Sequence, residues 1–247
     1  FDLYLSPSRN MVSAGYWRMT QRMCESLGMK MDRWDHDLRI PRGQKVVGKE
    51  VTAELDMSSA FAVSALAAVS GQAKILKFPS QSAQPDAVFV NVLRTMGARV
   101  ELRGDQLAVS QTGRLNGVVF SLKSCPDLFP VLAALCSLAE GESILDQAPQ
   151  LIFKESNRLQ KVADLVRLTG RSVEVLPDGL RICGPLKEPP QSGEVMHFDP
   201  DHDHRLAFAA AVLRQAGYPI EVTEPEVVRK SFPAFWQVAD LAKDGRG

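Results

Sequence analysis

The charged residues with the densest spacing lie in the stretch FDPDHDHRLAFAAAVLRQAG, which begins at residue 198. Its first eight residues carry three aspartates, two histidines and one arginine, namely Asp199, Asp201, Asp203, His202, His204 and Arg205. Carboxylates and imidazoles are metal ligands, so one hypothesis is a metal site. However, no HxxxH or HxxE spacing places them on one helical face, and Arg205 would repel a cation. We favour a helix entrance that Asp203 caps and in which Arg205 binds an anion, and we predict no metal.

A second group of charged residues opens the stretch FKESNRLQKVADLVRLTG. Lys154 and Arg158 are four residues apart, so a helix that begins near Lys154 would place both on one face. Two cations beside the free N–H groups of a helix N-terminus favour the binding of an anion. The alternative is a solvated surface network of Lys154, Glu155 and Arg158.

Two further helix starts carry groups that could do chemistry. In SCPDLFPVLAALC, Asp127 follows Pro126 and precedes an apolar helix. It is either an N-cap or a general base that takes a proton from a substrate hydroxyl. In EPEVVRKSFPAFWQV, Lys230 precedes Ser231, a predicted helix cap, and is either an anion ligand or part of a solvated pair with Arg229.

A repeat positions these groups. Three stretches align, LGMKMDRWDHDLRIP, MGARVELRGDQLAVS and TGRSVEVLPDGLRIC. In each, a glycine (Gly28, Gly97 or Gly170) follows a helical pattern, and two strands around a polar turn come next. Glycine is the usual residue where a helix ends in a left-handed conformation. The pattern therefore predicts three helices, each followed by a β-hairpin.

Asp56, Asp127 and Asp203 occupy equivalent starts of three apolar helices, 71 and 76 residues apart. A full unit reads strand, helix, strand, helix, strand, strand. We predict a half unit over about 1–42, full units over about 50–110 and 117–184, and a third that stops after its second helix. Mixed strands and apolar helices favour a compact α/β (α+β) fold over a solenoid.

Composition narrows the functional classes. The 29 basic residues balance the 29 acidic residues, so no global field favours nucleic acid or a membrane surface. The longest apolar stretches are too short to cross a bilayer. Four cysteines without CxxC spacing argue against zinc and disulfides, and reduced thiols fit a cytoplasmic protein.

The motifs KESNR, DHDHRLA, RKSFP, CPD and DMSSA, in their order along the chain, resemble the C-terminal portion of the 5-enolpyruvylshikimate-3-phosphate synthase family of enolpyruvyl transferases. The resemblance implies a fold of repeated βαβαββ units, with helices packed inside mixed sheets, and an active site between two domains. It assigns residues 1–50 to the last part of an incomplete N-terminal domain and residues 51–247 to the C-terminal domain. The missing N-terminal half of the same enzyme is then an expected partner, and the chain alone is expected to show little turnover.

The resemblance also implies the reaction and the residue roles. The family transfers the enolpyruvyl group of phosphoenolpyruvate to the 5-hydroxyl of shikimate 3-phosphate, in the shikimate pathway to aromatic amino acids, without a cofactor. The implied catalytic residues are Asp127, Lys154 and Glu155. Shikimate 3-phosphate would be bound by Ser13, Tyr16, Asp127, Gln150 and Lys154. Phosphoenolpyruvate would be bound by Arg158, Arg205 and Lys230.

The chain departs from the family motifs at Cys125, Gln150, Asn157 and His202. Asn157 replaces an acid that could pair with a neighbouring cation, and His202 replaces an asparagine beside Asp203. Two alternatives therefore stay open. One is UDP-N-acetylglucosamine enolpyruvyl transferase, which shares the fold and the donor, and the other is a non-catalytic anion-binding or interaction module.

Overall fold

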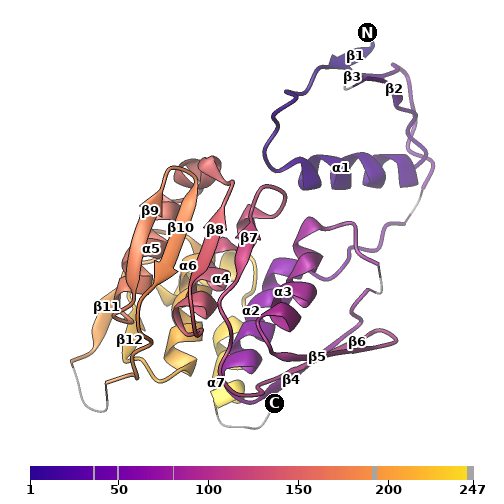
Figure 1. Cartoon of the computed structure of the whole chain (residues 1–247). Coiled ribbons are helices and arrows are strands. Elements are labelled where there is room, and N and C mark those ends of the chain that lie inside the picture. Colours follow the sequence, from indigo (N-terminus) through magenta and orange to yellow (C-terminus); the bar gives the residue numbers. More distant parts are fainter. Residues whose placement is uncertain (36, 49, 80, 191–193, 244–247) are drawn as a thin grey trace.

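The computed structural model describes residues 1–35, 37–48, 50–79, 81–190 and 194–243. Its first part is a small three-stranded antiparallel sheet and one helix, which Figure 1 shows beside the main body. The strand order is β1-β3-β2, and the elements are β1 (Leu3–Leu5), α1 (Ala14–Ser26), β2 (Asp32–Trp34) and β3 (Asp37–Ile40).

Three inner helices form the centre of the main body: α2 (Met57–Val69), α4 (Phe129–Ser137) and α6 (His204–Gln215). Each contacts the other two. Each is apolar on nearly its whole circumference, as expected for a helix enclosed by other elements. Alanines fill many of the contact positions and leave little exposed surface, as in Ala65, Ala133 and Ala210.

Sheets and outer helices enclose these three helices (Figure 1). One sheet has the order β4-β6-β5 and is antiparallel: β4 (Gln72–Leu76), β5 (Arg99–Arg103) and β6 (Gln106–Ser110). The second is mixed, in the order β7-β8-β10-β9: β7 (Val119–Ser121), β8 (Ser143–Asp146), β9 (Ser172–Leu176) and β10 (Gly179–Cys183). The third is a parallel pair, β11 (Met196–Phe198) and β12 (Ile220–Val222).

The remaining helices are outer ones and short 3-10 turns. The outer helices are α3 (Phe89–Thr95), α5 (Arg158–Arg167) and α7 (Phe235–Lys243). The 3-10 turns are η1 (Pro85–Val88), η2 (Pro126–Leu128), η3 (Pro149–Phe153) and η4 (Pro225–Lys230). Proline is the first residue of every one of the four, where its missing N–H breaks no helical hydrogen bond. Among the described residues, no helix has the length and apolar character needed to cross a membrane.

The predicted hairpins are present. β2 pairs with β3, β5 with β6 and β9 with β10, all antiparallel, although residue 36 in the first turn lies outside the described residues. Gly28, Gly97 and Gly170 have φ of 82°, 94° and 75°, the left-handed conformation predicted for them. The first strand expected in the unit that starts near residue 50 is absent among the described residues. The segment 51–56 runs into α2 without regular secondary structure and pairs with none of the described strands.

Helix α1 contacts the main body at its N-terminal end. The N–H of Ser13 donates to the carbonyl of Lys123 at 2.8 Å. Gln150 Nε2 donates to Ser13 Oγ at 3.2 Å, and Tyr16 Oη donates to Asp86 Oδ1 at 3.0 Å. Gly15 lies between these contacts and is buried. This end of α1 is therefore fixed to three separate segments of the body.

Gly15→Ala is expected to weaken this contact. A Cβ at residue 15 would lie 2.6 Å from Pro85 Cβ and 2.9 Å from the Ser124 carbonyl oxygen, so α1 must shift. Overpacking of this kind lowers stability by about 1–3 kcal/mol. Amide hydrogen exchange in α1 should accelerate, whereas Arg18→Ala, at an exposed position of the same helix, should leave it unchanged. Equal exchange in the two variants would show that Gly15 is not a contact residue.

Candidate functional site

The site is built where the N-terminal ends of the three inner helices meet. Asp56 caps α2 by accepting from the N–H of Ser58 at 3.2 Å, and Asp203 caps α6 by accepting from the N–H of Arg205 at 3.0 Å. Helix N-termini carry partial positive charge, so their convergence favours an anionic ligand.

Asp127 does not follow the capping pattern of the other two aspartates. It lies in η2, and neither η2 nor α4 has a side-chain cap hydrogen bond. The N-cap interpretation of Asp127 is therefore wrong, because the 3-10 turn that starts at Pro126 moves the start of α4 to Phe129. Its carboxylate is released for contacts with other segments.

Three cations surround the Asp127 carboxylate. Arg158 Nη1 lies 2.8 Å and Lys154 Nζ 3.2 Å from Oδ1, and Arg205 Nη2 lies 3.1 Å from Oδ2. Burial alone would raise the pKa of Asp127, but Arg205, Arg158 and Lys154 together lower it to about 2. Asp127 is therefore ionised at neutral pH. A ligand anion that draws these cations away would raise its pKa and make it a stronger base.

Arg158 links three carboxylates in the interior, with 1% of its side chain exposed. Its Nε donates to Asp203 Oδ2 at 2.6 Å, and its Nη2 donates to Glu155 Oε2 at 2.7 Å, in addition to the contact with Asp127. Asp203 is fully buried, so Arg158 compensates a charge that water cannot reach. The solvated-network alternative does not describe Arg158.

Lys154 reaches the site from an extended segment rather than from a helix. Helix α5 begins at Arg158 with Asn157 as its N-cap, whose Oδ1 accepts from the N–H of Gln160 at 3.2 Å. The condition for a shared helical face, a helix that begins near Lys154, is not met, because η3 ends at Phe153 and Lys154 has extended backbone angles. Asn157, which departs from the family motif, thus has a structural role as a cap.

Among the predicted site residues that the structure describes, two buried polar atoms have no hydrogen-bond partner: Arg205 Nε and Gln150 Oε1. The other nitrogens of Arg205 donate to Ser58 Oγ and to Asp127. Because a buried polar atom without a partner costs about 1–3 kcal/mol, these two atoms are candidates for ligand contacts.

The remaining predicted residues lie on either side of this cluster. On one side, Lys230 is more exposed, with 56% of its side chain accessible, and its Nζ lies 3.5 Å from Glu155 Oε1. On the other side, Ser13 and Gln150 contact each other, and burial together with Asp86 and Asp127 raises the pKa of Tyr16. The structure thus gathers the predicted residues along one chain of contacts and electrostatic interactions.

Sequence reasoning missed three residues of this region: Ser58, Asp86 and His204. Ser58 lies in an otherwise apolar helix, where its hydroxyl accepts from Arg205. Asp86 was signalled only by its position after a proline, which it shares with Asp127. His204 was weighed as a metal ligand and not as a neutral group beside Arg205.

The acidic and histidine side chains of residues 199–202 point to separate partners. Asp199 pairs with Lys161 at 3.0 Å, and His202 Nδ1 lies 2.7 Å from Glu224. Within the described residues, no group of three or more His, Cys, Asp or Glu side chains is placed to hold a metal ion.

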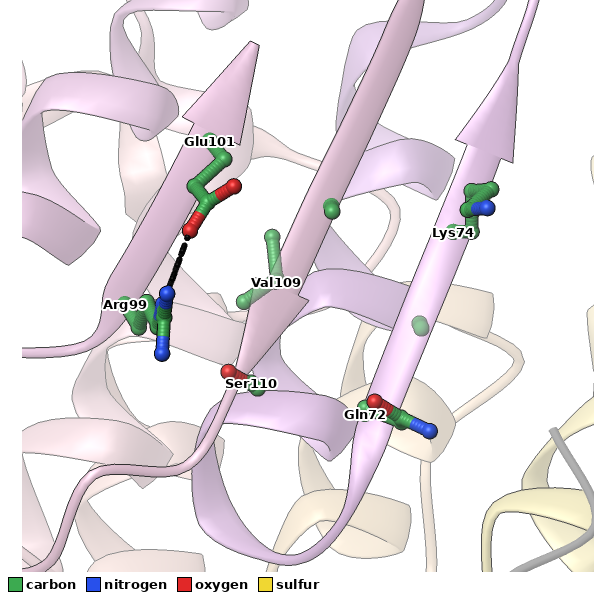
Figure 2. Close-up of a pocket in the computed structure, with 8 residues that line it drawn as sticks. Gln72, Lys74, Arg99, Glu101, Val109 and Ser110 are labelled. Carbon is green, nitrogen blue, oxygen red and sulfur yellow. Dashed lines mark hydrogen bonds and ion pairs between the residues drawn. The ribbon is translucent and has the colours of Figure 1, made fainter. Parts of the chain in front are cut away.

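A surface hollow of about 550 Å³ lies elsewhere, on the sheet β4-β6-β5 (Figure 2). Gln72, Lys74, Arg99 and Glu101 line it, and none of the predicted site residues does. Figure 2 shows Glu101 turned to Arg99, at 2.8 Å, and its other oxygen lies 2.7 Å from Arg103. Glu101, the acidic residue that lines this hollow, is thus already paired on the open sheet face, and we assign no site there.

Comparison with known proteins identifies the family. The family model described as EPSP synthase (3-phosphoshikimate 1-carboxyvinyltransferase) matches residues 7–239. The chain belongs to the EPSP synthase family. The resemblance inferred from the sequence motifs is thereby confirmed.

Curated relatives agree with this EPSP synthase assignment. A protein of Syntrophobacter fumaroxidans named 3-phosphoshikimate 1-carboxyvinyltransferase is 37% identical over 234 residues, which cover 92% of this chain and 53% of the relative. One of the same name from Methanoculleus marisnigri is 33% identical, covering 96% of this chain and 55% of the relative. The chain spans about half the length of the curated relatives it matches.

Solved structures confirm the predicted fold class. EPSP synthase from Acinetobacter baumannii superposes with a TM-score of 0.74 over 98% of this chain and 56% of that chain, at 24% identity. The enolpyruvyl transferase NikO from Streptomyces tendae superposes with a TM-score of 0.69 over 97% of this chain and 55% of that chain, at 17% identity. At such identities the likeness establishes the enolpyruvyl transferase fold.

In this EPSP synthase family chain, His204 should make stability depend on pH. Burial and the neighbouring Arg205 lower its pKa from 6.5 to about 4, so His204 is neutral in the folded state at pH 7. Because the folded-state pKa is below the unfolded one, protonation favours unfolding. The contribution is complete above pH 6.5 and is lost as the pH falls to about 4, by at most about 3 kcal/mol.

The test compares unfolding of wild type and His204→Gln between pH 7 and pH 4. The glutamine variant should lose less stability over this range, whereas His197→Gln, at an exposed position, should follow wild type. Asp86, whose pKa burial and Asp127 raise to about 6, contributes the opposite slope in this window, so the difference from wild type is the informative quantity. Identical curves for wild type and His204→Gln would refute the assignment.

Proposed function

We propose that this chain forms the larger part of an enzyme that transfers the enolpyruvyl group of phosphoenolpyruvate to the 5-hydroxyl of shikimate 3-phosphate, in the shikimate pathway. Family membership and the names of the relatives support the reaction. The observation that carries the proposal is the Asp127 carboxylate held by three cations at converging helix N-termini.

On the phosphoenolpyruvate side, Arg205 and Lys230 are the direct ligands in this proposal. Arg205 has an unpartnered buried Nε, and Lys230 is accessible at the edge of the cluster. Phosphoenolpyruvate carries a carboxylate and a phosphate, so it needs several fixed cations. Arg158 is already enclosed by carboxylates, so it supports binding through its charge and by holding Asp127 in place.

On the shikimate 3-phosphate side, Ser13, Tyr16, Gln150 and Lys154 form the proposed binding surface. Gln150 contributes an amide oxygen that has no partner among the described residues, and Lys154 contributes an ammonium next to the base. We assign residues 1–50 to the first domain and residues 51–247 to the second, so this surface joins the two. The chain spans about half the length of its relatives, and we propose that the other half of the polypeptide supplies further ligand contacts.

In the proposed reaction, each of these groups has a role. Asp127 takes the proton of the 5-hydroxyl while the oxygen of this hydroxyl bonds to C2 of phosphoenolpyruvate. Lys154 or Glu155 supplies the proton that C3 gains. The tetrahedral intermediate then returns a proton from C3 to the group that supplied it and loses phosphate from C2, which restores the double bond. The leaving phosphate takes the proton that Asp127 had accepted. The surrounding cations stabilise the negative charge on the phosphate and carboxylate throughout. No step requires a cofactor.

Calorimetric titration of the complete gene product tests this proposal. Shikimate 3-phosphate should bind, and glyphosate or phosphoenolpyruvate should bind more tightly once it is present. Arg205→Gln should weaken the binding of phosphoenolpyruvate and glyphosate and leave the affinity for shikimate 3-phosphate unchanged. Arg214→Gln, on the same helix, should change neither affinity. Binding of UDP-N-acetylglucosamine instead would assign the chain to the other enolpyruvyl transferase, and binding of neither would leave a non-catalytic module.

A further inference from the structure

Asp86 is a buried carboxylate that none of the proposed roles includes. It lies in η1 with 4% of its surface exposed. Its Oδ1 accepts the hydrogen bond of Tyr16 Oη at 3.0 Å, across 70 residues of sequence. A buried carboxylate is costly unless it is paired, so this contact needs an explanation.

The segment that carries Asp86 is fixed to the start of α2. Gln84 Oε1 accepts from the N–H of Met57 at 2.9 Å, and Gln84 Nε2 donates to the carbonyl of Leu55 at 2.8 Å. The neighbouring Pro85 packs against Gly15 of α1. Asp86 is therefore held in a defined position relative to both Tyr16 and the inner helices.

The Asp86 carboxylate determines the direction of the Tyr16 hydroxyl. An ionised carboxylate only accepts hydrogen bonds, so the single proton of Tyr16 points to Asp86. The phenol oxygen then has only lone pairs left for a ligand. It can accept a hydrogen bond from a hydroxyl, and it offers nothing to a phosphate or carboxylate oxygen.

We propose that Asp86 is a positioning residue for shikimate 3-phosphate, which holds the Tyr16 hydroxyl as a hydrogen-bond acceptor for a ring hydroxyl of this ligand. The inference rests on the proposed function, because it takes shikimate 3-phosphate as the ligand beside Tyr16. It adds a specificity element: at this point the site selects a hydroxyl donor, while the cations around Asp127 select the anionic groups.

Affinity for shikimate 3-phosphate in the complete gene product tests the role of Asp86. Asp86→Asn keeps the shape, but its amide can donate to Tyr16 and turn the phenol proton away. We expect the dissociation constant to rise roughly 2- to 12-fold, as for the net contribution of one hydrogen bond. Phosphoenolpyruvate affinity at saturating shikimate 3-phosphate should not change. Asp105→Asn, in the exposed β5–β6 turn, is the matched control.

A double-mutant comparison separates positioning from a general structural effect. Tyr16→Phe should lower the affinity for shikimate 3-phosphate to a similar degree. In the Tyr16→Phe background, Asp86→Asn should cause no further loss of affinity. Independent, multiplicative effects of the two substitutions would overturn the inference.

Ligand analogues test the hydrogen-bond direction without a variant of Asp86. The 5-hydroxyl gives its one proton to Asp127 in the proposed reaction, so the 4-hydroxyl is the donor to Tyr16. Fluorine cannot donate, so wild type should lose affinity for the 4-fluoro analogue as strongly as for the 4-deoxy analogue. Tyr16→Phe should not show this loss. Full affinity of wild type for the 4-fluoro analogue would contradict an acceptor role. If wild type does not bind shikimate 3-phosphate at all, the proposed function fails; if it binds and Asp86→Asn binds equally well, only the present inference fails.

Discussion

Arg158→Met is expected to lower the free energy of unfolding by about 3–5 kcal/mol, the range for breaking a buried ion pair from one side. The substitution leaves Asp203, which is fully buried, without the guanidinium that compensates it. Asp127 and Glu155 lose a partner as well. Chemical denaturation of the variant at pH 7 measures this change, and ligand binding should be lost with it.

Two comparisons define the control for Arg158. Arg167→Met removes an arginine from the same helix, where it forms an exposed pair with Asp164, and should cost no more than about 1 kcal/mol. Arg158→Lys should fall between the two, because an ammonium cannot reach three carboxylates as a planar guanidinium does. If Arg158→Met lowers the free energy of unfolding as little as Arg167→Met does, the three carboxylates must find other partners.

Asp127→Asn is expected to lower kcat of the complete gene product by about 10²- to 10⁴-fold, the usual contribution of a general base. An amide cannot take the proton of the substrate hydroxyl, although it is the same size. The positive charge of Lys154, Arg158 and Arg205 remains, so phosphoenolpyruvate should bind at least as tightly as before. Steady-state kinetics and calorimetry on the same preparation provide both readouts.

The matched control for Asp127 is Asp164→Asn, which removes an exposed carboxylate from α5 and should leave kcat unchanged. A kcat for Asp127→Asn within tenfold of wild type would move the base to another residue. A loss of phosphoenolpyruvate binding together with kcat would instead indicate that Asp127 organises the cations rather than accepting a proton.

The repeat and its helices could be predicted from the sequence because their signals are local. The apolar runs that follow Asp56, Asp127 and Asp203 predicted the inner helices, and the glycines after two outer helices, Gly97 and Gly170, predicted the hairpins. The family could be inferred because Lys154, Arg158 and Arg205 lie within short motifs, KESNR and DHDHRLA, that resemble those of the family. Their separation in sequence gives no measure of their distance, and the structure brings all three onto one carboxylate.

What the sequence could not predict depends on contacts between distant segments. Asp127 looks like the caps Asp56 and Asp203, and only the 3-10 turn at Pro126 separates it from them. The burial of Arg158 requires Asp203, 45 residues later in the chain. Asp86 has no local signature of its role, because its partner lies in α1.

The most direct test of the central claim is ³¹P NMR of the complete gene product with phosphoenolpyruvate and shikimate 3-phosphate. Assembly of Asp127 and its cations into an enolpyruvyl transfer site predicts that both substrates disappear in a one-to-one ratio, with equal formation of inorganic phosphate and a new phosphorylated vinyl ether. No consumption of phosphoenolpyruvate although both substrates bind, or consumption only with UDP-N-acetylglucosamine, would contradict the claim.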